Sequence, residues 1–173
     1  MANEQRHEAI PRLIVFDLDF TLWDCGGTWC DCLSPPFRVR QQRIEDRTGR
    51  HVRLYDDVHA ILKHCDDHEI SIALASRTGE PDWARQLLGH LDITHRFAFA
   101  EIYPSSKLRH FAALQKASGH AYQEMLFFDD EMRNIDEVSG LGVTSIFVRD
   151  GMTSELFHES LDRHAQRRER SQD

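Results

Sequence analysis

The sequence predicts an α/β fold built on a doubly wound, Rossmann-like parallel sheet. Two observations lead to this prediction. Short apolar runs of strand length alternate along the chain with segments whose apolar residues recur at helical spacing. Polar residues suited to chemistry follow directly after several of these runs. Alternating strands and helices form right-handed crossovers, so the sheet should be parallel, covered on both faces, and open to ligands at the carboxyl ends of its strands.

The first strand is expected at residues 13–16, a continuous Leu-Ile-Val-Phe run between Pro11 and Asp17. A short run without polar alternation is typical of a strand buried on both faces of a sheet. Further strands are expected at residues 70–75, 96–100, 125–128 and 143–148.

Helices are expected between the strands. Residues 56–68 have one apolar face, because apolar side chains recur there at i, i+3, i+4 and i+7 from Val58. Similar patterns predict helices that include residues 83–91, 108–114 and 135–138. The stretch from Asp24 to about Arg38 contains two glycines and two prolines and is expected to be a loop.

The length favours a single domain. A chain of 173 residues can bury roughly 70% of the surface that its unfolded form exposes, so one full core is possible. We expect one domain over residues 1–173, with its core at about 12–160. The N-terminal tail and the basic C-terminal tail, which contains Arg163, Arg167, Arg168 and Arg170, are expected to fray.

The composition excludes several classes of partner. The formal net charge of -8 disfavours binding to nucleic acid and to anionic membranes. No run approaches the roughly 18 apolar residues of a membrane span, and the first residues lack the apolar core of a secretory signal. We therefore expect a cytoplasmic monomer, with free cysteines. A zinc site at Cys25, Cys30 and Cys32 is disfavoured, because their spacing lacks the paired C-x2-C pattern.

Candidate functional residues follow the first, second and fourth predicted strands, and one lysine precedes the fourth. Along the chain they are Asp17, Asp19, Thr21, Ser76, Arg77, Lys107, Asp129 and Asp130. Four carboxylates in one crevice repel one another unless some are protonated or a cation lies among them. Magnesium prefers such oxygen ligands and is usually held by a few carboxylates together with a phosphate. A serine and a lysine beside it would complete an anion site.

These residues resemble a known family. Asp17-x-Asp19-x-Thr21, Ser76, Lys107 and Asp129-Asp130 match in order the four motifs of the haloacid dehalogenase superfamily. The stretches FDLDFTLW, ALASRTGE, EIYPSSKLRHF, FFDDEMRNI and VSGLGVT resemble its small magnesium-dependent phosphatases, over about residues 12–153. The resemblance implies a magnesium-dependent phosphatase that hydrolyses phosphate monoesters on a haloacid dehalogenase-like core.

The resemblance also implies a role for each carboxylate. Asp17 would be the nucleophile that forms an aspartyl-phosphate, and Asp19 the general acid for the leaving oxygen and then the base for water. Magnesium would be held by the Asp17 carboxylate, the Asp19 backbone carbonyl and Asp129. Asp130 would support these ligands without itself binding the metal.

The remaining residues would hold the substrate. Ser76 and Lys107 would bind the phosphoryl oxygens, and Thr21 would orient the nucleophile loop. Arg77 would meet the substrate beside Ser76, with Asn134 as a helper.

The spacing between the motifs leaves no room for a cap domain. Residues 19–76 can hold a loop and one principal helix, and residues 76–107 a helix and a strand. The active site should therefore be open, with residues 24–38 as its local rim. The relatives suggest phosphotyrosine-like groups on proteins, or sugar phosphates including glycated amines, as substrates.

Other functions remain possible on the same residues. A phosphatase-like scaffold could bind a partner without catalysis, since fold alone does not guarantee activity. A phosphoryl or acyl transferase could use the same nucleophile. A signalling receiver domain is disfavoured, because its lysine follows its acidic residues, whereas Lys107 here precedes Asp129.

Overall fold

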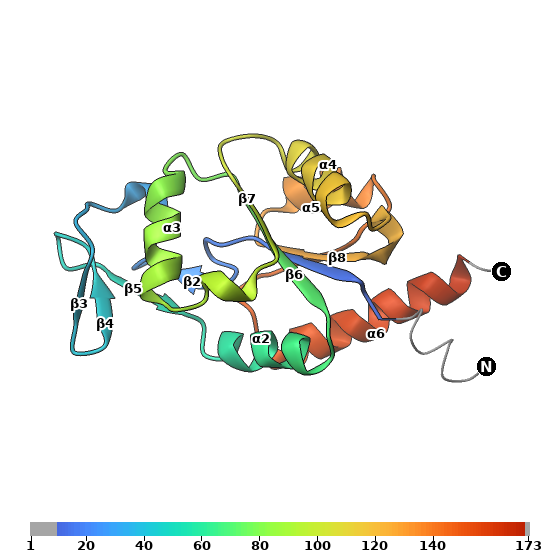
Figure 1. The fold of residues 1–173 in the computed structure, drawn as a ribbon, viewed down its shortest axis with the longest axis horizontal. Helices are drawn as coiled ribbons and strands as arrows, with labels where there is room; N and C mark the ends of the chain where they lie inside the picture. The colour runs from blue at the N-terminus through green and yellow to red at the C-terminus, as the bar shows by residue number, and fades with distance from the viewer. Residues whose placement is uncertain (1–9, 172–173) are drawn as a thin grey trace.

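A five-stranded parallel sheet forms the centre of the molecule, as the sequence predicts. A computed structural model describes residues 10–171 of the chain (Figure 1). The strand order is β7-β6-β1-β8-β9, and every neighbouring pair is parallel. The strands are β1 (Leu13–Phe16), β6 (Ser71–Ser76), β7 (Phe99–Ile102), β8 (Met125–Asp129) and β9 (Thr144–Phe147).

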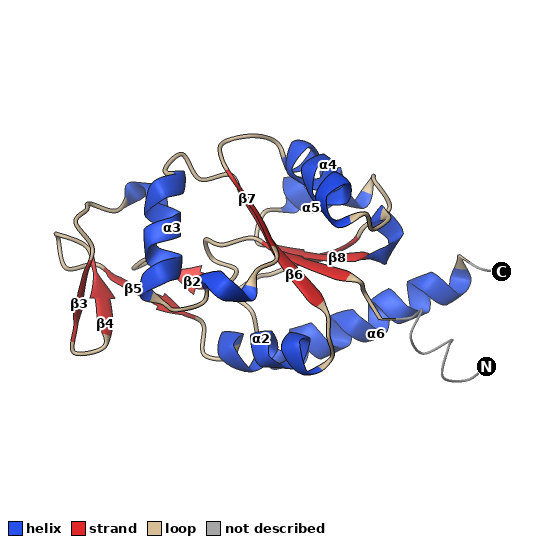
Figure 2. Cartoon of the chain, viewed as in Figure 1, coloured by secondary structure: helices blue, strands red, loops and turns tan. Residues whose placement is uncertain are grey.

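Helices cover both faces of this sheet (Figure 2). Leu13 and Val15 point to one face and belong to a core cluster with α4 (Lys107–Ser118) and α5 (Met132–Ser139). Ile14 and Phe16 point to the other face and pack in a cluster with α2 (Val58–Asp67), α3 (Pro81–His90) and α6 (Ser154–Arg170). The prediction of a doubly wound sheet is therefore confirmed.

The predicted strands and helices match the structure to within a few residues, with one larger shift. We expected a strand at residues 96–100, but β7 begins at Phe99. Residues Thr94–Arg96 form a 3-10 turn instead, and pairing with β6 starts at Ala73 opposite Phe99. The neighbouring strand, more than the weak apolar run, decides where β7 begins.

The segment between β1 and α2 is more regular than the sequence indicates. Residues 24–38 are expected to be a loop, and residues 25–37 contain no strand, but Asp24 and Arg38 at its ends belong to a second, antiparallel sheet of order β2-β5-β4-β3 that the sequence did not predict. Its strands are β2 (Trp23–Asp24), β3 (Arg38–Arg40), β4 (Arg43–Glu45) and β5 (His51–Leu54), and Cys30–Cys32 form a 3-10 turn. These strands are short and contain at most one buried residue each, so they carry little apolar periodicity and the pattern missed them.

The basic C-terminal segment is also ordered, contrary to our expectation of a frayed tail. Residues 154–170 form the helix α6, which Thr153 caps by accepting a hydrogen bond from the Leu156 N–H. Phe157, Ser160 and His164 are buried along one side of α6. Two of these residues are polar, so the buried side lacks the apolar stripe that identifies a packed helix in the sequence.

Two further expectations concern the ends of the chain and membranes. The predicted N-terminal tail lies almost wholly in residues 1–9, outside the described residues. Within residues 10–171, no helix is both long and apolar enough to cross a membrane.

Candidate active site

A cavity of about 260 Å³ opens at the carboxyl ends of β1, β6 and β8. This position is where parallel α/β sheets bind their ligands. Most of the residues predicted from the sequence line it. Its walls are formed by Asp17, Asp19, Trp29, Asp31, Ser76, Arg77, Thr78, Lys107, Asp130, Glu131, Arg133 and Asn134.

Lys107 joins two carboxylates at the floor of the cavity. Its Nζ lies 2.8 Å from Asp17 Oδ1 and 3.0 Å from Asp129 Oδ2, and it also donates to the Ala75 carbonyl. Lys107 is fully buried at the first turn of α4, where neither burial nor the helix dipole favours a cation. The two carboxylates outweigh the burial and raise the pKa of Lys107, so this side chain is an ammonium.

Burial has the opposite consequence for the carboxyl groups. Desolvation raises the pKa of Asp17 well above its usual value, Lys107 opposes this, and the charge of Asp129 adds to it. One lysine balances only one of the two carboxylates. When both carboxyl groups are ionised, the floor of the cavity has an excess of negative charge, which a cation would stabilise.

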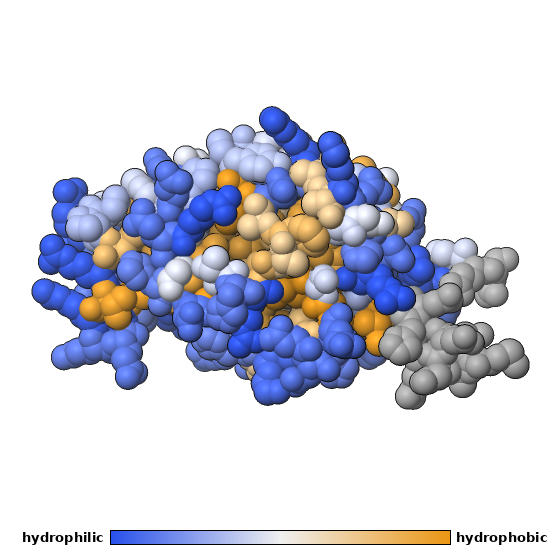
Figure 3. Space-filling model, in the orientation of Figure 1, coloured by the Kyte–Doolittle hydropathy of each residue, from blue (hydrophilic) through white to orange (hydrophobic). Residues whose placement is uncertain are grey.

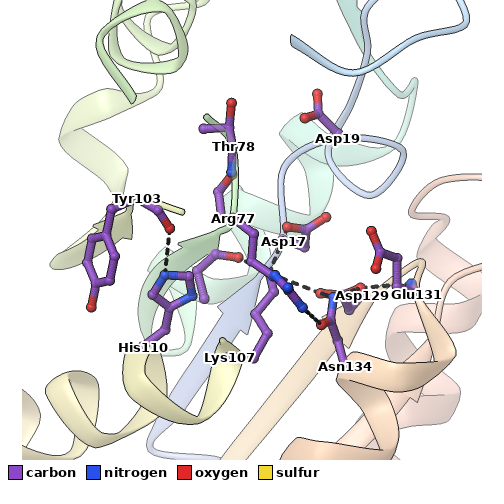
Figure 4. A network of polar contacts seen from close by, with 12 residues as sticks. Asp17, Asp19, Arg77, Thr78, Tyr103, Lys107, His110, Asp129, Glu131 and Asn134 are labelled. Atoms are coloured by element: carbon purple, nitrogen blue, oxygen red, sulfur yellow. Dashed lines mark hydrogen bonds and ion pairs between the residues drawn. The ribbon is translucent and has the colours of Figure 1, made fainter. Parts of the chain in front are cut away.

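A relay of hydrogen bonds connects Asp129 to Arg77 (Figure 4). Asn134 Nδ2 donates to both oxygens of Asp129, at 3.0 and 3.1 Å, and Asn134 Oδ1 accepts from Arg77 Nη1 at 3.0 Å. The Glu131 N–H also donates to Asp129, at 2.8 Å. Asp129 is completely buried, and these donors fix its orientation. Asn134, considered only as a helper from the sequence, therefore links the Arg77 side chain to the acidic cluster.

The carboxylates can hold a hard cation. Ligand oxygens of Asp17, Asp129 and Asp130 lie within 4.8 Å of one another. Burial, with the nearby charges of Asp129 and Glu131, raises the pKa of Asp130 to about 7. Clustered oxygen ligands with unbalanced negative charge fit a divalent cation such as magnesium. The carboxylate of Asp19 is not in this group, but the ligand expected from Asp19 is its backbone carbonyl, so that prediction stays open.

Asp19 is held away from this cluster by residues that follow it in the chain. Its Oδ1 accepts hydrogen bonds from Trp23 Nε1 at 2.7 Å, from the Cys30 N–H at 2.9 Å, and from Cys25 Sγ at 3.6 Å. Burial raises the pKa of Asp19, while the bonds from Trp23 and Cys30 oppose that change. All three donors contact Oδ1, so Oδ2 is the oxygen that can exchange a proton with a ligand.

The predicted hydroxyl ligands lie in different surroundings. Ser76 is buried at the end of β6, lines the cavity, and accepts a bond from the Thr78 N–H at 3.3 Å. Thr21 is fully buried and does not line the cavity. Its hydroxyl has no hydrogen-bond partner within the described part of the chain, and its carbonyl accepts from the Met152 N–H. Thr21 therefore lies outside the cavity lining, and its backbone carbonyl joins the loop after β1 to Met152.

Several cavity residues were not predicted as site residues. Trp29 and Asp31 come from the expected rim, residues 24–38, but the sequence analysis did not single out individual side chains within that rim. Thr78 and Glu131 directly follow the predicted site residues Arg77 and Asp130, and Arg133 directly precedes Asn134, so adjacency is the signal that could have identified them. Trp23 was missed because a buried tryptophan looks like a core residue in the sequence.

Comparisons with known proteins agree on one family. The family model for acid phosphatases matches residues 9–167. Magnesium-dependent phosphatase 1 of Homo sapiens is 43% identical over 158 residues, covering 90% of this chain and 88% of that protein. A HAD-like hydrolase superfamily protein of Schizosaccharomyces pombe is 35% identical over 147 residues, covering 78% and 83% of the two chains.

A solved structure supports the same fold. The crystal structure of a HAD-superfamily hydrolase from Ehrlichia chaffeensis superimposes with a TM-score of 0.61 at 17% identity. The match covers 91% of this chain and 97% of that chain. At this low identity, the likeness concerns the fold alone.

Proposed function

This chain belongs to the acid phosphatase family and to the haloacid dehalogenase-like hydrolase superfamily, and from that premise we propose how its residues hydrolyse a phosphate monoester. It is a magnesium-dependent phosphatase, like the human relative whose name states that activity. The observation that carries the proposal is the placement of Asp17. This carboxylate lies in the cavity, 2.8 Å from Lys107 Nζ and within ligand distance of Asp129 and Asp130.

Magnesium would be held by Asp17, Asp129 and Asp130, with the Asp19 backbone carbonyl as a further ligand. When bound, it supplies positive charge for the phosphoryl oxygens, which lowers the barrier to attack by an anionic nucleophile. It also balances the carboxylate that Lys107 leaves unpaired, so the charge of the metal and the charge of the cluster fit each other.

Asp17 and Asp19 would divide the chemistry between them. In the first step a carboxylate oxygen of Asp17 attacks phosphorus, the bond to the ester oxygen breaks, and Asp19 gives that oxygen a proton. In the second step Asp19 takes a proton from water, the water oxygen attacks phosphorus, and the Asp17 carboxylate leaves. The raised pKa of Asp19 supports this cycle, because such a carboxyl both keeps and returns a proton more readily near neutral pH.

Three cationic or hydroxyl side chains would position the phosphoryl group. Ser76 and Lys107 line the same cavity as Asp17, and Arg77 is held over it by Asn134. Lys107 already contacts Asp17 and Asp129, so its contact with a phosphoryl oxygen would be made while it keeps the nucleophile in place. Thr21 would act indirectly, by fixing the loop that carries Asp17 and Asp19.

The open cavity sets the range of substrates that we propose. No separate cap domain covers it within residues 10–171, and the rim consists of single side chains such as Trp29 and Asp31. A phosphotyrosine group on a protein, or a sugar or glycated-amine phosphate, could enter such a site. The proposed setting is a single-domain, monomeric, cytoplasmic enzyme without nucleic-acid ligands.

The test measures phosphate release from p-nitrophenyl phosphate, a phosphotyrosine peptide and a set of sugar phosphates, with magnesium and with EDTA. Wild type should turn over only with magnesium, and Asp17→Asn should lose at least about a thousandfold in kcat, as expected when a nucleophile is removed. Asp31→Asn is the matched control, because Asp31 lines the same cavity without a proposed chemical role.

The covalent step needs its own measurement. Borohydride added during turnover should reduce the acyl phosphate at position 17 to homoserine, which mass spectrometry detects. A wild-type protein that is inert toward every substrate would favour the non-catalytic scaffold. Phosphoryl transfer to an added alcohol in preference to water would favour the transferase.

A further inference from the structure

The second sheet has a charge opposite to that of the rest of the chain. Residues 38–53 contain six arginines and two acidic residues. The other residues contain fifteen lysines and arginines and twenty-seven acidic residues. A cationic segment on a protein of net charge -8 attracts anionic partners that the remaining surface repels.

The strand register gathers three of these six arginines on one side of the sheet. Arg38 lies opposite Glu45, and Arg40 lies opposite Arg43. Directly paired residues in antiparallel strands point to the same face, so Arg38, Arg40 and Arg43 form one surface, here called the arginine face. The alternate residues Ile44 and Val52 are buried on the other side.

Glu45, opposite Arg38, is the one carboxylate that the strand pairing places on the arginine face, and it makes no ion pair there within the described part of the chain. Within residues 10–171, no acidic side chain lies within ion-pair distance of Arg38, Arg40 or Arg43. The carboxylate of Asp46 accepts instead from three backbone N–H groups and from the Thr48 hydroxyl. Like charges directly opposite each other, such as Arg40 and Arg43, destabilise a strand pair. Stability of the sheet therefore does not account for this arrangement.

The arginine face belongs to a sheet that is joined to the rim of the active site. Arg50 Nη1 donates at 2.9 Å to the carbonyl of Cys32, the last residue of the 3-10 turn that includes Asp31 and follows Trp29, two residues that line the cavity. β2, which pairs with β5, carries the Trp23 that holds Asp19. The hairpin of β3 and β4 projects from the end of the molecule opposite α6, and this end is mostly hydrophilic in Figure 3.

We propose that the arginine face binds an extended acidic segment of a phosphoprotein substrate and so presents its phosphate to the cavity. This inference rests on the proposed phosphatase function. Arginine side chains at alternate positions of one strand match the alternate side chains of a second extended strand, and guanidinium groups bind carboxylates in a bidentate manner.

Two features favour a polypeptide over a nucleic acid. Residues 38–53 contain no Phe, Tyr or Trp, whereas single-stranded nucleic acids are usually held by stacking on aromatic side chains. β3 is the edge strand of its sheet, and Val39 is 55% exposed on it. An edge strand can add an extended peptide through backbone hydrogen bonds, with an exposed apolar side chain as a further contact.

The test compares wild type with the triple variant Arg38→Gln, Arg40→Gln, Arg43→Gln. The control variant, Arg12→Gln, Arg163→Gln, Arg170→Gln, removes the same charge from exposed positions outside the second sheet. Fluorescence anisotropy measures binding of a labelled peptide of alternating Glu and Thr, and of oligothymidylate of equal charge. Kinetics compare a phosphotyrosine peptide flanked by this acidic sequence with p-nitrophenyl phosphate.

The arginine-face variant should bind the acidic peptide about tenfold more weakly, as three exposed ion pairs predict, and lose a similar factor in kcat/KM for the acidic phosphopeptide. Its turnover of p-nitrophenyl phosphate should equal that of wild type and of the control. Equal losses in both variants, no binding of the acidic peptide by wild type, or tighter binding of oligothymidylate would each overturn the proposal. Turnover of p-nitrophenyl phosphate by wild type tests the phosphatase function separately. Binding of the acidic peptide to wild type can also be measured at increasing salt concentration, which requires no variant.

Discussion

The polar residues of the two sheets differ in their burial and in their pairing. In the parallel sheet, β1 and β8 are buried along their whole length, and the functional side chains lie where those strands end. The buried charged side chains there are paired with one another, as Lys107 is with Asp17 and Asp129. In the second sheet, β3 is exposed at every position and its arginines have no acidic partner among the described residues.

Because of this difference, substitutions of the buried residues should change the stability of the protein, whereas substitutions of the exposed arginines should change which partners the surface binds. Removing one member of a buried, connected set leaves the other members unpaired and costs much free energy. Removing an exposed charge costs little, but it changes what the surface attracts. Substitutions at the buried polar residues of the first sheet should therefore affect folding and catalysis together, whereas substitutions at the exposed arginines of β3 and β4 should affect folding and the chemical step little.

The largest effect should come from Lys107→Met. It leaves the buried carboxylates of Asp17 and Asp129 without their ammonium partner, which should lower the free energy of unfolding by about 3–5 kcal/mol. Phosphatase activity should disappear as well. The control is Lys63→Met, which breaks an exposed ion pair with Asp67 on α2 and should leave the urea midpoint nearly unchanged. Similar midpoints for the two variants would contradict the comparison.

Acid should destabilise the packing of α6 on the parallel sheet. His164 is fully buried, its Nδ1 lies 3.0 Å from the Thr144 hydroxyl, and burial lowers its pKa to about 4. The unfolded chain takes up a proton on this histidine near pH 6.5, and the folded chain does so only near pH 4. Its contribution, on the order of 3 kcal/mol, is therefore complete above pH 6.5 and is lost as the pH falls toward 4.

The measurement for His164 is urea unfolding at pH 7 and at pH 4.5. His164→Gln should lose less stability over this interval than wild type, because Gln does not titrate. His59→Gln, at an exposed position on α2, serves as the control and should follow wild type. Parallel curves for all three proteins would show that His164 does not carry the effect.

A smaller effect is expected where the two sheets meet, at Trp23. Trp23→Phe removes the Nε1–H that donates to Asp19 Oδ1, a bond to a charged group worth about 1.5–3 kcal/mol. We expect kcat/KM to fall about tenfold or more. The basic limb of the pH profile should move to higher pH, because loss of a donor to the carboxylate raises the pKa of Asp19 further.

The shift of the pH limb distinguishes positioning of Asp19 from a general loss of packing. Trp83→Phe is the matched control, since Trp83 packs edge-on against Phe37 and donates no hydrogen bond to Asp19 within the described residues. An unchanged limb in Trp23→Phe, with reduced activity, would mean that Trp23 acts only through packing.

The smallest effect should be a gain in stability in the hairpin of β3 and β4. Gln41 and Gln42 both have positive φ, the conformation that two-residue hairpins usually give to Asn-Gly. Gln42→Gly should raise the free energy of unfolding by about 0.5–1 kcal/mol without changing the turnover of p-nitrophenyl phosphate. Gln86→Gly, in the middle of α3, should have the opposite sign. A loss of stability in Gln42→Gly would rule out a strained turn.

Much of the parallel sheet and its site could be predicted from the sequence. The apolar run of residues 13–16 is long enough to identify a buried strand by itself, and its neighbours follow the same rule. Parallel strands bring their carboxyl ends to one edge, so Asp17, Ser76 and Asp129 had to converge once their strands were identified. Here a local pattern and a general rule of topology were sufficient.

The orientation of individual side chains could not be obtained in this way. Trp23 holding Asp19, and Asn134 joining Arg77 to Asp129, depend on where loops and helices pack after the sheet has formed. The helix α6 was taken for a tail because two of its buried residues are Ser160 and His164. Such residues are buried only because partners such as the Thr144 hydroxyl lie next to them in the folded chain.

The sequence by itself determined the class of fold, the edge of the sheet that carries the chemistry, and the residue types gathered there. These follow from the spacing of apolar residues and from the order of the strands along the chain, both of which are visible in short stretches of the sequence. Only the tertiary structure decided that Lys107 bridges Asp17 and Asp129, and that Arg38, Arg40 and Arg43 share one face. Both depend on strand register and on contacts between distant segments, and these are set when the whole chain packs.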